Sequence, residues 1–157
     1  MLKFWFIFIL LLSCCGYSTK TIIPSHLKTV AIPVVGNETM KPGLDGLLTD
    51  QLISDFTKDR SLRITSLDKA NLILNCKITN YDRSPQSYTS AQEVLVWKIT
   101  LSAYVEAEDK VENTFIYQGD VSTFVTYDAQ SESEDTGIDR AIKKLSQEII
   151  RKVLATW

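Results

Sequence analysis

Residues 71–81, Asn-Leu-Ile-Leu-Asn-Cys-Lys-Ile-Thr-Asn-Tyr, decide the fold of this chain. Apolar side chains stand at every second position, at Leu72, Leu74, Cys76 and Ile78, and alternate with polar ones at Asn75, Lys77 and Thr79. Successive side chains of a strand point to opposite faces. This period of two therefore predicts a strand with one buried face and one solvated face. Cys76 falls on the buried face, where a free cysteine behaves as a small hydrophobic residue.

The same alternation recurs twice further along the chain. Residues 93–106 alternate in this way, and after a turn at residues 108–110 the segment 114–127 returns as the next strand. Three long strands with short connections predict an antiparallel meander. Between the first two strands, the segment Asp82–Gln92 is polar and contains Pro85, which predicts a loop.

Two segments have apolar residues at helical spacing. The first carries Leu44, Leu48, Leu52 and Phe56, and the second, from about Thr136 to the C-terminus, carries Ile138, Ala141, Ile142, Leu145, Ile149 and Val153. Short strands at Thr29–Val35 and Ser61–Ser66 flank the first helix, so these two strands are expected to run parallel. The predicted fold is a single α+β domain over residues 28–157, a two-layer sandwich of two helices packed on one face of a mainly four-stranded mixed or antiparallel sheet.

Composition fits one globular domain and gives little support to nucleic-acid binding. The chain has 157 residues, of which 45% are hydrophobic and 23% are charged, and this length buries one hydrophobic core. The 17 basic and 19 acidic residues nearly balance. A nucleic-acid-binding domain is usually clearly basic, so no nucleic-acid partner is expected.

The N-terminus is typical of an exported protein. Lys3 precedes an apolar run, Phe4 to Leu12, that as a helix is too short to span a bilayer. This order predicts a signal peptide over residues 1–13. The segment Leu11-Leu12-Ser13-Cys14 resembles a bacterial lipobox, so residues 14–27 are expected to form a lipidated tether carrying a diacylglycerol group and fatty acyl chains such as palmitate. Ser13 favours Cys14 as the modified residue, and Cys15 remains an alternative lipidation site.

The sequence shows no arrangement typical of catalysis. Its one histidine, His26, lies in the predicted tether, and no histidine or cysteine stands near it at metal-ligand spacing. A periplasmic hydrolase would need that histidine, or an unpaired acidic cluster, buried in a cleft. The glycines form no phosphate-binding loop, and the acidic run at residues 132–135 is expected to be solvated beside a helix N-terminus. We therefore expect a binding or assembly protein, neither an enzyme nor a holder of a metal or cofactor.

Several short motifs together resemble the LPS-assembly lipoprotein family (LptE). They are Cys15-Gly16-Tyr17, the segment 23–33 (Ile-Pro-Ser-His-Leu-Lys-Thr-Val-Ala-Ile-Pro), Asn37-Glu38-Thr39, Gly43-Leu44 and the segment 70–74 (Ala-Asn-Leu-Ile-Leu). The resemblance covers nearly the whole mature chain. A Cys-Gly-Tyr start favours Cys15 as the lipidated residue, against the lipobox preference for Cys14, so both remain candidates.

The resemblance implies a lipid-anchored lipoprotein on the periplasmic face of the outer membrane. Its implied partners are lipopolysaccharide and a large β-barrel that inserts lipopolysaccharide into the outer leaflet, which the lipoprotein plugs and helps to fold. The candidate contact residues are Arg83 and Tyr88 in the segment 82–92, with Lys41, Lys77 and Arg83 as partners for phosphate groups.

A second family resemblance competes with the first. The pattern Val-Ala-Ile-Pro-x-x-x-Asn-x-Thr at residues 30–39 also resembles the start of lipoproteins that activate peptidoglycan synthases or belong to secretion assemblies. The long central strands and the C-terminal helix favour the LptE family.

Overall fold

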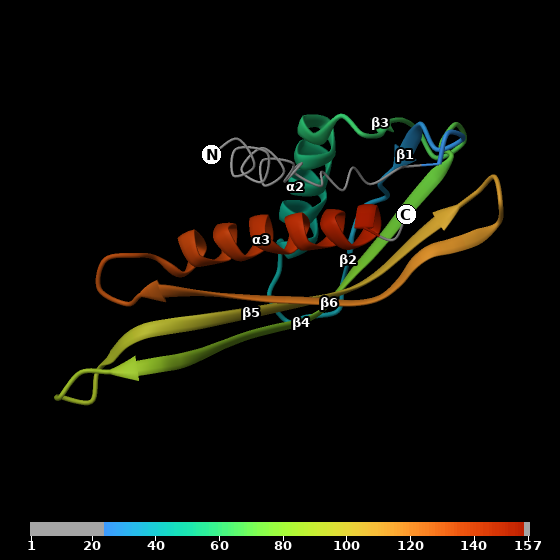
Figure 1. Ribbon diagram of the computed structural model, residues 1–157. Helices are drawn as coiled ribbons and strands as arrows, with labels where there is room; N and C mark the ends of the chain where they lie inside the picture. The colour runs from blue at the N-terminus through green and yellow to red at the C-terminus, as the bar shows by residue number, and fades with distance from the viewer. Residues whose placement is uncertain (1–23, 156–157) are drawn as a thin grey trace, which may run out of the picture.

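The computed structural model describes residues 24–155 (Figure 1). Its elements, in chain order, are β1 (Thr29–Ala31), β2 (Gly36–Asn37), α2 (Leu44–Asp59), β3 (Arg63–Ile64), β4 (Leu72–Tyr88), β5 (Val94–Asp109), β6 (Thr114–Asp128) and α3 (Glu134–Ala155). Cys14 and Cys15 lie outside the described residues, so the lipidation site stays a prediction. Among residues 24–155, no helix combines the length and the apolar character needed to cross a membrane.

The strands form one mixed sheet. Their order is β3-β1-β4-β5-β6, and β2 pairs with β4 beyond the end of β1. β1 runs parallel to β3 and to β4, whereas β4, β5 and β6 form the expected antiparallel meander. The sheet has six strands where mainly four were expected. The predicted strand Thr29–Val35 ends at Ala31, and a separate short strand, β2, follows at Gly36–Asn37. Pro33 lies between the two and has no amide hydrogen to donate to a ladder.

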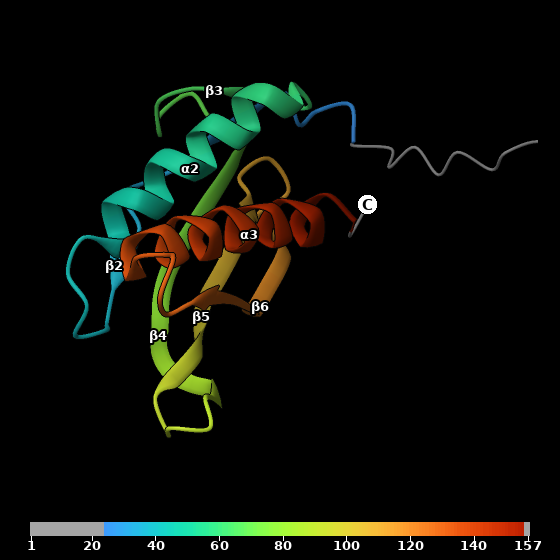
Figure 2. The ribbon, with the colours of Figure 1, turned by 90° about the vertical axis from the view of Figure 1, so that its left-hand side faces the viewer.

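Both helices cover the same face of this sheet, which confirms the two-layer α+β sandwich (Figure 2). The sheet contributes the alternating residues of β4 and β5 to the core, and the two helices contribute their apolar stripes. The buried helical residues include Leu44, Leu48, Leu52, Phe56, Ile138, Ala141, Ile142, Leu145, Ile149 and Val153. Every residue of the two predicted stripes is therefore buried against the sheet or the other helix.

The N-terminal end of α3 is held close to the sheet. A methyl group added at Gly137 would lie 2.8 Å from Cδ1 of Tyr127 and 3.0 Å from Cδ1 of Ile99, so only glycine allows this approach. The helix begins at Glu134, two residues before the expected start, because the Ser133 hydroxyl accepts a hydrogen bond from the amide of Thr136 at 3.2 Å. This is the usual geometry of an N-cap.

The prediction of a loop over Asp82–Gln92 is largely wrong. β4 continues to Tyr88, and the turn to β5 is made by residues 89–93, where the Thr89 amide bonds the Glu93 carbonyl at 2.8 Å. Pairing with β5 needs only backbone groups, so polar side chains do not end the strand. Within residues 24–155, β2 pairs with β4 only as far as Ile78, so Pro85 lies on an edge with no further partner strand in this part of the chain, the position where a strand tolerates proline. The β4–β5 turn projects beyond the helical layer (Figures 1 and 2).

The thiol of Cys76 is buried in the core, as the alternation predicts, and desolvation raises its pKa to about 12. A thiol reagent near pH 8 is therefore expected to leave Cys76 unmodified in the folded protein and to label it after unfolding in guanidinium. Mass spectrometry of the peptide that contains Cys76 measures both results. Rapid labelling of the folded protein would contradict this burial.

Candidate functional site: a cation–aromatic cluster at the start of the last helix

Glu134, the first residue of α3, joins three groups that are distant in the sequence. Its Oε1 accepts hydrogen bonds from Lys41 Nζ and from the Tyr81 hydroxyl, each at 2.8 Å. Its Oε2 lies 3.2 Å from Nη1 of Arg83. Lys41 comes from the loop before α2, and Tyr81 and Arg83 come from β4. One carboxylate thus connects the first helix's entry loop, the sheet and the last helix.

Arg83 also packs against aromatic rings from the other two long strands. Its guanidinium carbon lies 3.8 Å from the ring centroid of Trp97 on β5. Its Nε donates a hydrogen bond to the Tyr127 hydroxyl on β6 at 2.6 Å. A planar guanidinium stacks on an aromatic ring in a way that a lysine ammonium does not. The aromatic rings therefore fix the orientation of the Arg83 side chain.

A β-bulge places these β4 side chains on the helical face. The pairing of β4 with β5 is regular up to Ile78 opposite Ala103 and resumes with Asn80 opposite Ser102, so one extra residue stands in β4. A shift of one residue moves every following side chain to the other face. Tyr81 and Arg83 consequently share the face of Ile78. Sequence alternation alone does not reveal this change of phase.

The electrostatics of the cluster favour a charged carboxylate with cationic neighbours. The hydrogen bonds from Lys41 and Tyr81 hold the pKa of Glu134 below its ordinary value of 4.5. Burial and the hydrogen bond to Glu134 raise the pKa of the Tyr81 hydroxyl, which stays protonated. The cations Lys41 and Arg83 face one anion, Glu134, so the cluster keeps a surplus of one positive charge. Both cations are partly exposed, and an incoming phosphate oxygen is the kind of group this surplus attracts.

These pKa shifts predict a loss of stability in acid. The pKa of Glu134 in the folded protein is below its ordinary value of 4.5. The contribution of its carboxylate to the free energy of unfolding is therefore complete above about pH 4.5 and is lost as the pH falls through the lowered pKa. Urea unfolding at about pH 7 and about pH 3 should show a larger decrease in the free energy of unfolding for the wild type than for Glu134→Gln. An equal decrease in both proteins would show that Glu134 does not carry the acid sensitivity.

The structure brings two of the four predicted contact residues together and leaves two apart. Lys41 and Arg83 meet through Glu134. Lys77 lies on the opposite, solvated face of β4, where its Nζ bonds Glu38 Oε1 at 2.9 Å. Tyr88 is exposed at the far end of β4, next to the turn. Glu134, expected to be a solvated member of an acidic run, is the residue that organises the site, and sequence reasoning missed it.

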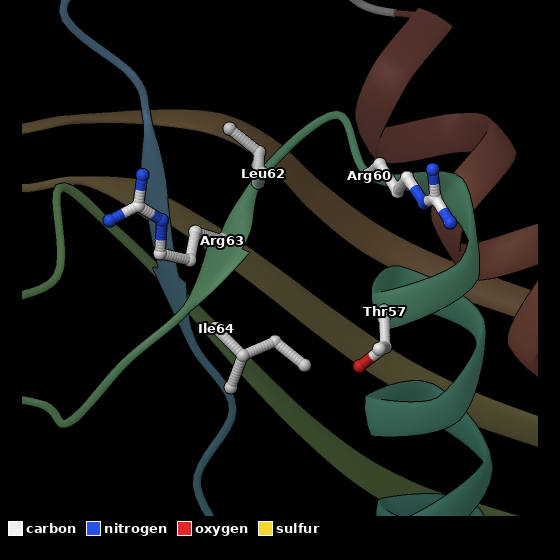
Figure 3. Close-up of a pocket in the computed structure, with 5 residues that line it drawn as sticks. All are labelled: Thr57, Arg60, Leu62, Arg63 and Ile64. Carbon is white, nitrogen blue, oxygen red and sulfur yellow. The ribbon is translucent and has the colours of Figure 1, made fainter.

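A shallow hollow lies elsewhere, between the end of α2 and β3. Its volume is about 420 Å³, and it is lined by Thr57, Arg60, Leu62, Arg63 and Ile64. The two arginine side chains point away from each other in Figure 3. They do not converge on one ligand atom, so the hollow lacks the paired donors of a built anion site.

Comparison with known proteins places the chain in a family. The sandwich is a small α+β fold that solved structures of bacterial lipoproteins share, as described below. The model of the LptE family, described as lipopolysaccharide-assembly, matches residues 27–153, and the chain belongs to this family. The family consists of non-catalytic lipopolysaccharide-assembly lipoproteins. A comparison with curated proteins found no match.

Solved structures share the fold at low sequence identity. A hypothetical protein from Chlamydia trachomatis aligns with a TM-score of 0.63 and 14% identity, covering 82% of this chain and 96% of that one. A minor lipoprotein from Acinetobacter baumannii aligns with a TM-score of 0.54 and 16% identity, covering 82% and 93%. The rare lipoprotein B from Shewanella oneidensis gives 0.51 and 10%, covering 80% and 95%. At these identities the likeness establishes the fold.

Proposed function

We propose that this lipopolysaccharide-assembly protein is anchored by lipid to the periplasmic face of the outer membrane, where it partners and plugs a lipopolysaccharide-transport β-barrel, binds lipopolysaccharide and catalyses no reaction. The observation that carries the proposal is the family match over residues 27–153, which spans nearly all of the described domain. The rival role, as regulator of a peptidoglycan synthase or part of a secretion assembly, rests on the short pattern at residues 30–39.

The outer face of the sheet supports a fit inside a barrel. Five cross-strand rows of β4, β5 and β6 alternate with the buried rows and so point away from the helices. The rows are Asn75–Glu106–Gln118, Lys77–Tyr104–Asp120, Asn80–Ser102–Ser122, Asp82–Thr100–Phe124 and Ser84–Lys98–Thr126. Apart from Phe124, every member carries a polar group. The lumen of an outer-membrane barrel is also polar, so this largely polar face matches such surroundings.

The projecting β4–β5 turn is the proposed contact with the barrel. A photo-crosslinking amino acid at position 88, at the end of β4, is expected to give an adduct with the barrel in intact cells. The same amino acid at exposed position 58, near the end of α2, serves as the matched control. Absence of a barrel adduct from position 88, with the protein present in the membrane at normal level, would contradict contact through this turn.

The cation–aromatic cluster is the proposed contact for a lipopolysaccharide phosphate. Lys41→Gln removes the surplus charge and leaves Arg83 paired with Glu134. This variant is expected to bind lipopolysaccharide several-fold more weakly, whereas Lys77→Gln, on the opposite face, is expected to bind as the wild type does. Equal binding by Lys41→Gln and the wild type would contradict a role for the cluster.

Lipidation is tested separately from partner binding. Mass analysis of the mature protein is expected to show a chain that begins at Cys14 or Cys15 and carries a diacylglycerol group with a further acyl chain. The variant with serine at both positions is expected to leave the membrane fraction. An unmodified, soluble N-terminus in the wild type would contradict the anchor.

A further inference from the structure

Three potential metal ligands converge at the end of the sheet opposite the β4–β5 turn. His26 lies just before β1, Asp109 ends β5, and Glu112 belongs to the connection to β6. His26 Nε2 lies 2.6 Å from Asp109 Oδ2 and 3.9 Å from Glu112 Oε1, and one ligand atom from each residue falls within 4.8 Å of the others. We propose that these three side chains bind a divalent transition-metal ion of the zinc type.

Asp109 is pre-organised to present one oxygen to a ligand. Its side chain is only 3% exposed. Its Oδ1 accepts hydrogen bonds from the amides of Val111 at 2.8 Å and Glu112 at 3.2 Å, which leaves Oδ2 directed at His26. A carboxylate whose second oxygen is fixed by hydrogen bonds is typical of metal sites, where such bonds orient the ligand.

The same turn positions Glu112. Because the Glu112 amide bonds Asp109, its backbone is held beside the site, while its side chain is 63% exposed. The third ligand therefore lies on the open side of the site, where water can complete four-fold coordination. Metal–ligand bonds of about 2.0–2.2 Å place tetrahedral ligand atoms about 3.4 Å apart. The 2.6 Å contact has to open by less than an ångström and the 3.9 Å contact has to close by about half of one.

Charge and ligand type favour a divalent transition metal. Two carboxylates beside a neutral imidazole carry two negative charges, which one divalent ion balances. Imidazole suits zinc and similar metals, whereas calcium and magnesium prefer oxygen ligands alone. The presence of His26 therefore selects zinc over the alkaline-earth ions.

A bound ion would fasten the N-terminal segment to the sheet. Leu27 is buried in the core, and its amide bonds the Pro24 carbonyl at 2.9 Å, which forms the turn that presents His26. The metal would add a second attachment between this segment and the β5–β6 connection, two parts of the chain that are 83 residues apart at His26 and Asp109. The site rests on these contacts alone and does not depend on the proposed function.

The test measures Zn²⁺ binding to the detergent-solubilised mature protein after removal of metal with a chelator. Titration calorimetry is expected to show one ion per chain at this site, and added ZnCl₂ is expected to raise the melting temperature. Glu112→Gln, at an exposed position, should fold normally and bind Zn²⁺ at least about tenfold more weakly, with His26→Ala weaker still. Glu106→Gln, a change at a half-buried position on β5 outside the site, is the matched control and should bind as the wild type does.

Two results would overturn the site. One is the absence of a zinc-dependent heat and of a melting-temperature shift in the wild type. The other is equal zinc binding by the wild type and Glu112→Gln, which would place the metal elsewhere, for example on a cysteine near the N-terminus. Neither result affects the lipid anchor or the barrel partner.

Discussion

Phe56→Ala is expected to lower the free energy of unfolding by about 3–5 kcal/mol. Phe56 is 0% exposed and lies on the inner face of α2, in the core cluster formed by both helices and the sheet. Truncation to alanine removes the buried ring and leaves a cavity that the surrounding elements fill only in part. A domain of this size has a total stability of about 5–15 kcal/mol. Denaturation by urea, followed by circular dichroism, measures the change.

Ile53→Ala is the matched control on the same helix. Ile53 is 37% exposed, so its truncation removes less buried surface and is expected to cost about 1 kcal/mol or less. Equal destabilisation by the two substitutions would show that α2 does not pack on the sheet through the face that contains Phe56.

Glu134→Ala is expected to lower the free energy of unfolding by about 2 kcal/mol. The substitution leaves Lys41 and Arg83 without their shared carboxylate and the Tyr81 hydroxyl without its acceptor. Partly buried groups that lose a charged partner keep their desolvation penalty. The free-energy cost of removing one partner is therefore larger than the net stabilisation that the pair provides. The same denaturation experiment measures the effect.

Asp135→Ala separates the cluster from the general effect of an acid near a helix N-terminus. Both acids lie in the first turn of α3 and interact similarly with the helix dipole, but Asp135 is exposed. We expect its removal to cost only a few tenths of a kcal/mol. If the two variants lost equal stability, the contacts of Glu134 with the cations would contribute nothing measurable.

The sequence was sufficient to predict the fold class and most of the core. The alternation around Leu72–Ile78 and the helical stripes carry a strong signal because one face of each element is buried. That signal fades where both faces of a strand are polar. The second half of β4 therefore reads as a loop, although its backbone pairs with β5 to the end of the strand. Backbone hydrogen bonds stabilise such a strand and leave no trace in the residue pattern.

The site was less predictable because it depends on contacts between distant residues. Lys41 and Arg83 were candidates on charge alone, but their meeting point, Glu134, is 93 residues from Lys41. The bulge that turns Arg83 toward α3 has no sequence signature here. His26 shows the same limit: its neighbours in the sequence offer no metal-ligand spacing, whereas the fold sets it beside Asp109 and Glu112.

Copurification is the sharpest test of the proposed function, because the LptE-type role requires a specific partner in the outer membrane. We expect a C-terminally tagged protein, extracted from membranes in mild detergent, to recover the lipopolysaccharide-transport β-barrel as its main companion in mass spectrometry. The variant with serine at positions 14 and 15, which lacks the proposed anchor, should recover much less. Recovery of a peptidoglycan synthase or a secretion component, with no transport barrel, would rule out the LptE-type role.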